Sequence, residues 1–323
     1  MKVSIASSER RGARLKARRP RRWQRLRSMA KARKILAQVK AIRNIATVTK
    51  TMSLVSTARF KKTHDVANGA RPYNNALNDL IADTVARSSE KDLRHPLLHP
   101  AKEVGTEVLL VLGSHRGLCG AYNGSIAKLT VERLEQLKTA DLKVLVRGTG
   151  RRGLQHLRAR GVEIDVEYPQ FDYLPRPAEV NQLADALMEE FLSGKISGLE
   201  VAYMQFVSAG RQKPAIAQIL PMSEMEAPER VSIAIRRPTP YEFIPSPGEV
   251  LKDLLPASVR LKLYQCFLDA AVSEQISRMT AMRAATDNAE EMIRNLTIRY
   301  NRARQAQITT ELAEIMGGSE MSE

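Results

Sequence analysis

Three glycines, Gly148, Gly150 and Gly153, have the spacing with which dinucleotide-binding proteins bring their backbone close to a pyrophosphate. They follow a strand-like run and precede a helix-like run, so a nucleotide- or NAD-binding α/β protein is one hypothesis. Two features weaken it. Asp165 and Glu167 follow Gly153 after only twelve and fourteen residues, whereas a ribose-binding acid usually follows after about twenty. The next helix is short and rich in arginine, so we favour an ordinary glycine-rich turn.

A second glycine-rich segment, residues 113–120, contains His115 and Cys119, the residue types of a thiol nucleophile and its base. The segment lacks the Gly-Lys-Ser/Thr sequence of a Walker loop. A sulfur nucleophile also needs a positioned base and an oxyanion site, and the sequence shows neither. We therefore interpret the segment as a tight turn with a small buried thiol.

Two further histidines, His95 and His99, are four residues apart, but prolines flank them and no third ligand lies nearby in the sequence. A metal site is therefore not predicted. No pair of acidic residues stands out for general acid–base catalysis. The sequence predicts no catalytic residue, no bound cofactor and no metal site on this chain.

The 323 residues carry a net charge of +16, from 51 Lys and Arg and 35 Asp and Glu. Residues 1–28 contain eleven of the basic residues and one acid. Such an arm can bind nucleic-acid phosphates or direct targeting, so a basic coiled-coil nucleic-acid-binding protein is a second alternative. We favour a disordered extension before a start at Met29.

The longest uncharged stretch, 117–127, is too short to span a bilayer. Cys119 and Cys266 fit a reducing compartment.

Two stretches free of Pro and Gly, residues 21–68 and 257–316, have apolar residues at helical spacing, and Pro256 precedes the second. As helices they would be about 70 and 90 Å long. A compact chain of this size has a diameter of about 50 Å, so the helices must protrude. They are expected to pack together as a coiled-coil-like pair, and a bundle of broken helices is the alternative. The apolar positions of the first helix are Ile35, Val39, Ile42, Ile45, Val48, Met52 and Val55.

The segment between these helices alternates strand-like and helix-like runs, which is typical of a Rossmann-like α/β domain with a mostly parallel sheet and helices on both faces. The last two strands are expected to form an antiparallel hairpin. The expected strands are 107–112, 142–147, 162–167, 199–208 and 215–220, and the expected helices are 123–138, 151–160 and 178–193. The predicted domains are an extension at 1–28, a coiled-coil helix at 29–90, the α/β domain at 91–220, a Pro-rich linker at 221–249, a coiled-coil helix at 250–318 and a tail at 319–323.

Four segments carry recognisable motifs. They are Lys50-Thr-Met-Ser-Leu-Val55 with Ala58-Arg-Phe-Lys-Lys62, the glycine motif of Arg116, Gly117, Cys119 and Gly120, the helical stretch 273–290, and the final stretch 300–315. Together these segments resemble the signatures of the gamma subunit of F-type ATP synthases, and the resemblance covers residues 29–318.

The resemblance implies a non-catalytic rotor shaft. In that family, the two long helices form an antiparallel coiled coil inside a head of alternating alpha and beta subunits, and the α/β domain stands on the membrane c ring beside the epsilon subunit. Proton flow turns the ring, and the shaft changes the catalytic sites on beta in sequence. The resemblance therefore implies no nucleic-acid partner, no cofactor and no direct bilayer insertion. It implies a peripheral membrane protein on the cytoplasmic face of a bacterial plasma membrane, with the mitochondrial matrix face as the alternative.

The resemblance also assigns roles to particular residues. Met52 and Arg278 match the family's neck region, where the helices pass the moving lobes of beta. The residues that match a cluster hydrogen-bonded to a catch loop of the head are Arg304, Gln305, Thr309 and Glu311.

Two positions depart from the family pattern. His115 stands where the family commonly has an acid before the glycine motif, so an acid-dependent contact is not expected there. Ile244 stands where the family often has an acid near the c ring, so the contact with the ring is expected to differ.

Overall fold

A computed structural model describes residues 5–87, 95–98, 105–171, 174–222, 244 and 246–319. Most of the predicted Pro-rich linker, His99 and residues 320–323 of the predicted tail lie outside the described residues. The chain forms two compact units. We call residues 53–281 the sheet unit, and residues 1–52 together with 282–323 the helix-end unit.

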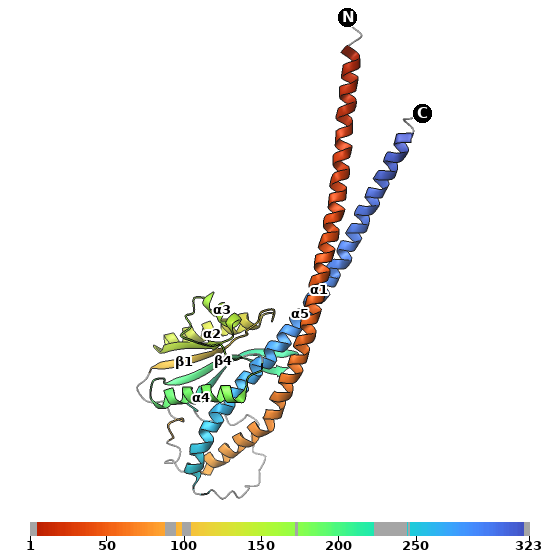
Figure 1. Ribbon diagram of the computed structural model, residues 1–323. Helices are drawn as coiled ribbons and strands as arrows, with labels where there is room; N and C mark the ends of the chain where they lie inside the picture. The colour runs from red at the N-terminus through yellow and green to blue at the C-terminus, as the bar shows by residue number, and fades with distance from the viewer. Residues whose placement is uncertain are drawn as a thin grey trace. The chain divides into compact units, whose positions relative to one another are not determined.

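Two long helices each contribute residues to both units: α1, Ile5–Arg87, and α5, Pro247–Ser319 (Figure 1). α5 begins nine residues before Pro256, which was predicted to precede the helix and lies inside it. A proline in a helix loses one backbone hydrogen bond. Here the same part of α5 buries four aliphatic side chains on one face, which stabilises it: Leu251, Leu255, Val259 and Leu263. α1 also differs from prediction, because it continues through residues 5–28, where a disordered extension was expected.

Strands and shorter helices alternate in the described part of the sheet unit. They are β1 Thr106–Leu112, α2 Tyr122–Thr139, β2 Lys143–Thr149, α3 Arg151–Arg158, β3 Val166–Tyr168, α4 Pro177–Leu192, β4 Gly198–Ser208 and β5 Arg211–Leu220. The strand order is β3-β2-β1-β4-β5. All neighbouring strands are parallel except β4 and β5, which form an antiparallel hairpin. The predicted mostly parallel α/β sheet is therefore confirmed.

Two strands begin four residues away from their predicted starts, and the other three begin within one residue of theirs. β3 begins at Val166 rather than Val162, because Val162 and Ile164 pack against the core cluster on the α2 and α3 face of the sheet instead of pairing in it. β5 begins at Arg211 and includes Pro214, which was expected in the turn. Proline cannot donate to a strand ladder, and it is tolerated here because β5 is an edge strand.

Alternate residues of β1 enter two different cores, one on each face of the sheet. Val108 and Leu110 pack with side chains of α4 and α5. Leu109 and Val111 pack with side chains of α2 and α3. All four are 0 or 1% exposed. Because successive side chains of a strand point to opposite faces, helices cover both faces of this sheet, as Figure 1 shows.

Inside the sheet unit, α1 and α5 also pack on each other. Ala67 of α1 joins Leu268 and Val272 of α5 in a small core. The Asn74 amide nitrogen donates a hydrogen bond to Gln265 Oε1 at 2.8 Å. These contacts bring together segments almost two hundred residues apart, since Asn74 and Gln265 are separated by 191 positions in the sequence.

In the helix-end unit, α1 and α5 form an antiparallel pair, as predicted. The hydroxyls of Thr49 and Thr286 share a hydrogen bond of 2.7 Å, and residues 38–42 face residues 292–299. The buried or half-buried positions of α1 recur in alternating steps of four and three, which is the coiled-coil repeat. These seam positions are Ile35, Val39, Ile42, Ala46 and Thr49.

The predicted apolar stripe of α1 coincides with this seam only as far as Ile42. Beyond it, Ile45 and Val48 each lie one position before a seam residue, and Met52 lies one position before the half-buried Ser53. Ile45, Val48 and Met52 are 55, 55 and 39% exposed. We call these three residues the outer stripe. Small side chains occupy the seam at this level, which allows close approach of the helices and leaves the larger apolar side chains outside. The prediction that the outer stripe packs within the coiled coil is therefore wrong.

Candidate functional site

The side chain of Arg278 on α5 is buried against the loop between β1 and α2, which contains the glycine motif. Its Nε donates a hydrogen bond to Gly117 O at 3.2 Å, and its Nη2 donates to Arg116 O at 2.9 Å. Arg278 is only 7% exposed. The structure thus joins a predicted neck residue to the glycine motif, from which it is separated by about 160 residues.

Two neighbours on α5 complete the hydrogen bonding of this guanidinium group. Glu274 Oε1 lies 2.6 Å from Arg278 Nη2 and forms an ion pair with it. Arg278 Nη1 donates to Gln275 Oε1 at 3.3 Å. Glu274 and Gln275 are 9 and 1% exposed. Because a buried charge is costly unless it is paired and hydrogen-bonded, these contacts hold Arg278 in one position.

A network of buried polar groups fixes the same loop from within. Asn123 Oδ1 accepts from Ser114 N at 3.1 Å, and Asn123 Nδ2 donates to Ser114 Oγ at 2.7 Å. Ser114 Oγ donates to Arg116 O at 2.9 Å. Cys119 is 3% exposed, and its sulfur accepts from Asn123 Nδ2 at 3.4 Å. These contacts agree with the prediction of a tight turn around a small buried thiol.

The loop presents one large apolar side chain outward. Leu118 has a φ of 64°, in the left-handed region that side chains other than glycine seldom adopt, and it is 57% exposed. Gly120 follows with a φ of 59°. Non-glycine residues held in this region persist where their surroundings over-determine them, often at functional sites.

A second contact ties α2 to α5 near this loop. The Tyr122 hydroxyl lies 3.2 Å from Ala270 O and 3.4 Å from Leu112 O. Burial raises the pKa of Tyr122 well above its usual value, and the charge of Glu274 adds to the rise. The hydroxyl therefore keeps its proton and remains a hydrogen-bond donor.

The glycine spacing at 148–153 serves close packing, and it leaves no room for a pyrophosphate. A side chain at Gly150, whose φ is 82°, would place its Cβ 2.1 Å from Gly113 O. A Cβ at Gly153 would lie 2.5 Å from Gly113 Cα. The Arg152 and Gly153 amides, which would face a phosphate, donate to Ser114 O at 3.0 and 3.1 Å.

The two acids that could have bound a ribose are also engaged. Asp165 Oδ2 accepts from Val146 N at 2.6 Å. Glu167 forms an ion pair with Arg158. The geometry therefore argues against the dinucleotide-binding hypothesis.

The predicted catch-loop residues lie near the end of α5 in the helix-end unit. Arg304, Gln305 and Thr309 are exposed, and Glu311 is half-buried. With about 100° of rotation per residue, Arg304 and Glu311 share one face, and Gln305 and Thr309 share the next. The Glu311 carboxylate accepts from Gln307 Nε2 at 3.0 Å, and Thr309 Oγ1 donates to Gln305 O at 3.0 Å. Both faces offer side chains that can form hydrogen bonds with a partner.

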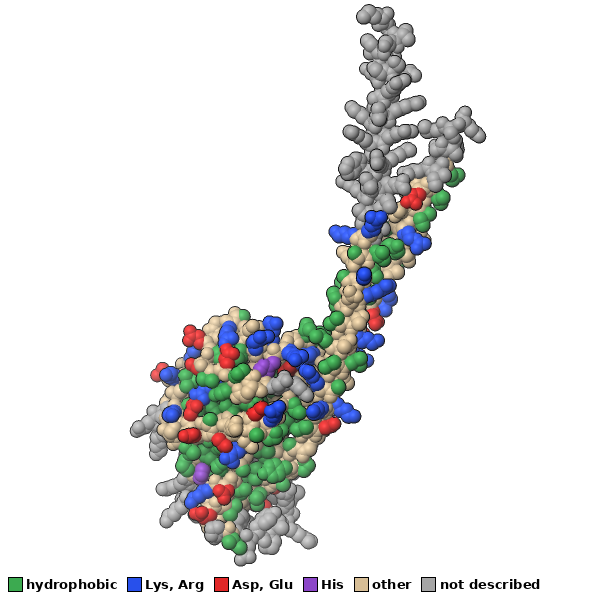
Figure 2. All heavy atoms as spheres, viewed as in Figure 1, with side chains coloured by type: hydrophobic (Ala, Val, Ile, Leu, Met, Phe, Trp, Pro, Cys, Tyr) green, Lys and Arg blue, Asp and Glu red, His purple; other side chains and the backbone are tan. Residues whose placement is uncertain are grey.

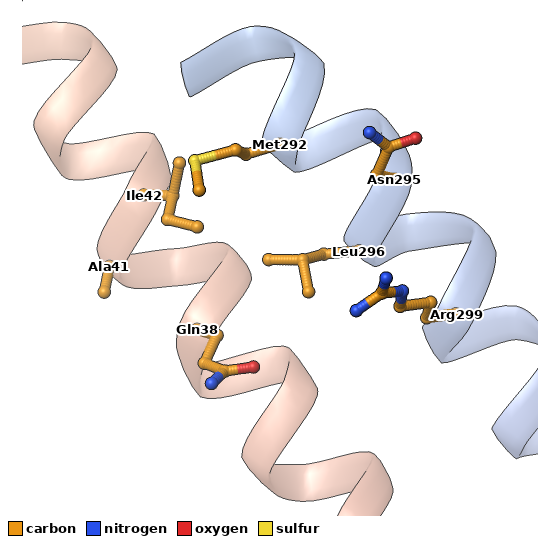
Figure 3. Close-up of a pocket in the computed structure, with 7 residues that line it drawn as sticks. All are labelled: Gln38, Ala41, Ile42, Met292, Asn295, Leu296 and Arg299. Carbon is orange, nitrogen blue, oxygen red and sulfur yellow. The ribbon is translucent and has the colours of Figure 1, made fainter. Parts of the chain in front are cut away.

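An open groove of about 480 Å³ lies between the two helices of the helix-end unit. Ile42, Met292 and Leu296 point into the space between the helices (Figure 3). Further apolar side chains lie on the outer surfaces of both helices, as Figure 2 shows. On α5 they are Ile298, Ile308, Leu312 and Met316, which are 43 to 70% exposed.

No group of three or more His, Cys, Asp or Glu residues among the described residues could hold a metal ion. Within the same described part of the chain, no helix is long and apolar enough to cross a membrane.

Comparison of the sequence with known proteins gives consistent matches along nearly the whole chain. A family model described as ATP synthase matches residues 31–321. The ATP synthase gamma chain of Rhodopirellula baltica is 39% identical over 297 residues, covering 91% of this chain and 100% of that protein. The ATP synthase gamma chain of Leptospira biflexa is 33% identical over 292 residues, covering 90% of this chain and 99% of that protein.

Solved structures share the fold. A chain of the Euglena gracilis mitochondrial ATP synthase, in its OSCP/F1/c-ring structure, aligns with a TM-score of 0.59 at 17% identity and covers 91% of this chain and 95% of its own. A chain of the rotor of the same enzyme aligns with a TM-score of 0.54 at 15% identity and covers 86% of this chain and 99% of its own.

Proposed function

Since the chain belongs to the family of ATP synthase gamma chains, we propose that it turns as the central stalk of that enzyme. In this role it couples proton flow through a membrane ring to ATP synthesis or hydrolysis on other subunits. The observation that carries the proposal is the match to a gamma chain over 100% of that relative's length.

The helix-end unit has surface properties suited to a shaft enclosed by other subunits. It pairs two helices through a narrow seam and leaves the outer stripe exposed. Exposed apolar patches on a protein commonly mark surfaces that partners cover. We infer that alpha and beta subunits of a catalytic head surround this unit, and that the neck includes Met52.

The proposed role requires no catalytic residue on this chain. Catalysis is assigned to beta subunits, and the closed turn around Gly150 supports a chain that binds no nucleotide of its own. The remaining proposed partners are the epsilon subunit and the c ring, which the sheet unit would contact. The proposed location is the cytoplasmic face of a bacterial plasma membrane, where the chain is peripheral.

The exposed end of α5 supplies the proposed contact with a catch loop of the head. Arg304 can form charge-assisted hydrogen bonds, and these are stronger than neutral ones. Glu311 can accept such bonds from the partner in addition to the one from Gln307. Gln305 and Thr309 add neutral donors and acceptors on the adjacent face.

Purification of the native complex tests the proposal. The chain is expected to co-purify with alpha, beta and epsilon subunits in one ATP-hydrolysing assembly, with the partners identified by mass spectrometry. The intact mass of the chain would show whether the mature protein begins at Met1 or near Met29. Recovery of the chain alone, or with nucleic acid and without a catalytic head, would contradict the rotor function.

A further inference from the structure

We propose that Arg278 and Glu274 form a mechanical joint that ties the loop after β1 to α5, so that the sheet and this helix turn as one body. This role rests on the proposed function, in which torque must pass between an α/β foot and a helical shaft. Arg278 is here a positioning residue inside the chain. The resemblance instead placed it at a contact with the head.

The hydrogen bonds of Arg278 support an internal role. Its Nε and Nη2 bind two successive carbonyl groups of the loop, and Nη1 and Nη2 bind Gln275 and Glu274 on its own helix. All three guanidinium nitrogens therefore have acceptors within the chain. With 7% of the residue exposed, little of it remains for a partner subunit.

The loop is in turn attached to the sheet. Ser114 O accepts from the amides of Arg152 and Gly153 at the start of α3. Gly113 N donates to Thr149 O at the end of β2. A force on Arg278 therefore passes through the loop to β1, β2 and α3.

A second attachment makes the joint resistant to turning. The Tyr122 hydroxyl holds Ala270 O on α5, eight residues before Arg278. Eight residues of helix span about 12 Å. Two attachments about 12 Å apart on the same helix resist its rotation against the sheet, in addition to the core packing of α5 against β1 and α4.

The two cysteines of the chain can be used to measure opening of this joint. Cys119 lies within the loop and is 3% exposed, and Cys266 lies on α5 in the core and is 4% exposed. Opening of the loop would expose only Cys119, whereas unfolding of the unit would expose both. Labelling of the full chain with a thiol reagent, followed by peptide mass spectrometry, measures the two cysteines separately.

Arg278→Gln is expected to speed labelling of Cys119 by about tenfold or more, with Cys266 unchanged, because the loop loses its charge-assisted hydrogen bonds. Arg260→Gln is the matched control. It makes the same change on the same helix, but its ion pair with Asp185 is on the surface, with side chains 38 and 50% exposed. Equal protection of Cys119 in Arg278→Gln and wild type would overturn the proposal.

If both cysteines of Arg278→Gln react faster, the unit unfolds as a whole. The labelling of Arg278→Lys then tests the proposal. Lysine keeps the charge beside Glu274 but cannot direct separate nitrogens at the two carbonyls. Faster labelling of Cys119 alone supports the joint, and any other labelling pattern in Arg278→Lys overturns it.

The mechanical role is tested in the assembled enzyme. The variant in which only Cys119 is labelled faster than in the wild type is expected to assemble and to hydrolyse ATP. It is expected to pump fewer protons per ATP into reconstituted vesicles. Full pumping despite a loosened loop would overturn the mechanical role. Failure of the wild-type chain to enter any ATP-hydrolysing complex would instead contradict the proposed function, so the two failures are distinguishable.

Discussion

The sheet unit and the helix-end unit differ in how far their large apolar side chains are buried. In the sheet unit, side chains such as Leu110 and Leu187 are fully buried in cores shared by the sheet and its helices. In the helix-end unit, the outer stripe and several apolar residues of α5 remain on the surface. Its seam also contains Thr49 and Thr286, which are 9% exposed and hydrogen-bonded to each other.

Apolar side chains can contribute either to the stability of their own chain or to its association with a partner. Burial within one chain stabilises that chain, and each fully buried aliphatic side chain contributes about 1.5 to 3 kcal/mol. Apolar residues left on the surface contribute to association instead, because a partner can remove them from water. The sheet unit is therefore expected to respond to core substitutions through stability, and the helix-end unit through assembly and coupling.

The largest effect on stability is expected from Leu110→Ala in the sheet unit. Leu110 is 0% exposed, and its truncation leaves a cavity between the sheet and α4 and α5. The free energy of unfolding is expected to fall by about 2 to 5 kcal/mol, measured by chemical denaturation of the purified chain.

Val48→Ala in the helix-end unit is the matched comparison. Val48 is 55% exposed, so its truncation removes little buried surface. The loss is expected to stay below about 0.5 kcal/mol. Losses of similar size for both variants would show that the outer stripe is buried within the chain and would end the contrast between the units.

The sheet unit also encloses a carboxyl group whose ionisation opposes folding. Burial raises the pKa of Asp269 to about 6 from an ordinary value of 3.8, although the hydrogen bond from Gln265 and the charge of Arg71 lower it. Between these two pH values Asp269 is ionised in the unfolded chain but still protonated in the folded one. The free energy of unfolding therefore falls as pH rises and levels off above about pH 6. Asp269→Asn is expected to remove this slope and to stabilise the unit at pH 7 by about 3 kcal/mol.

The measurement is the free energy of unfolding between pH 4 and 8, compared for the wild type and Asp269→Asn. Asp185→Asn serves as the control, since it removes a carboxylate whose side chain is 50% exposed and whose surface ion pair contributes about 0 to 1 kcal/mol. Parallel curves for wild type and Asp269→Asn would show that Asp269 ionises alike in both states.

A smaller effect is expected at the threonine pair of the helix-end unit. Thr49→Val keeps the shape of the side chain but leaves the Thr286 hydroxyl without this partner, so the unit is expected to lose about 1 kcal/mol. The double variant with Thr286→Val removes both polar groups, and its loss should be less than the sum of the two single losses. Hydrogen exchange of amides 39–49 measures the local stability, and additive losses would show that the two hydroxyls act independently.

The same contrast explains how far the sequence could predict the structure. The sheet was predictable because continuous apolar runs such as 107–112 and alternating helices have a strong local signal. The seam of α1 was predicted as far as Ile42 and then missed. Apolar residues continue at helical spacing through the outer stripe, while the true seam passes through Ala46 and Thr49, which carry no hydrophobic signal.

The contacts of Arg278 could not be predicted from the sequence for a different reason. Arg278 and the glycine motif belong to separate sequence motifs. Their contact depends on the folded path of about 160 intervening residues, so local spacing could not reveal it. The glycines at 148–153 were interpreted correctly as a turn, but their packing on Gly113 became evident only in the structure.

The smallest effect on stability and a clear effect on function are expected together from Met52→Lys. Met52 is 39% exposed in the helix-end unit, so the added charge stays hydrated and unfolding should change by less than about 0.5 kcal/mol. In the assembled enzyme, a head that covers the outer stripe would have to desolvate this charge, which is costly without a partner. Reconstituted vesicles should therefore show fewer protons pumped per ATP hydrolysed. Thr47→Lys adds the same charge about 140° around the helix and should couple normally. Normal pumping by Met52→Lys would mean that no partner covers the outer stripe, and the apolar surface of this unit would then need another explanation.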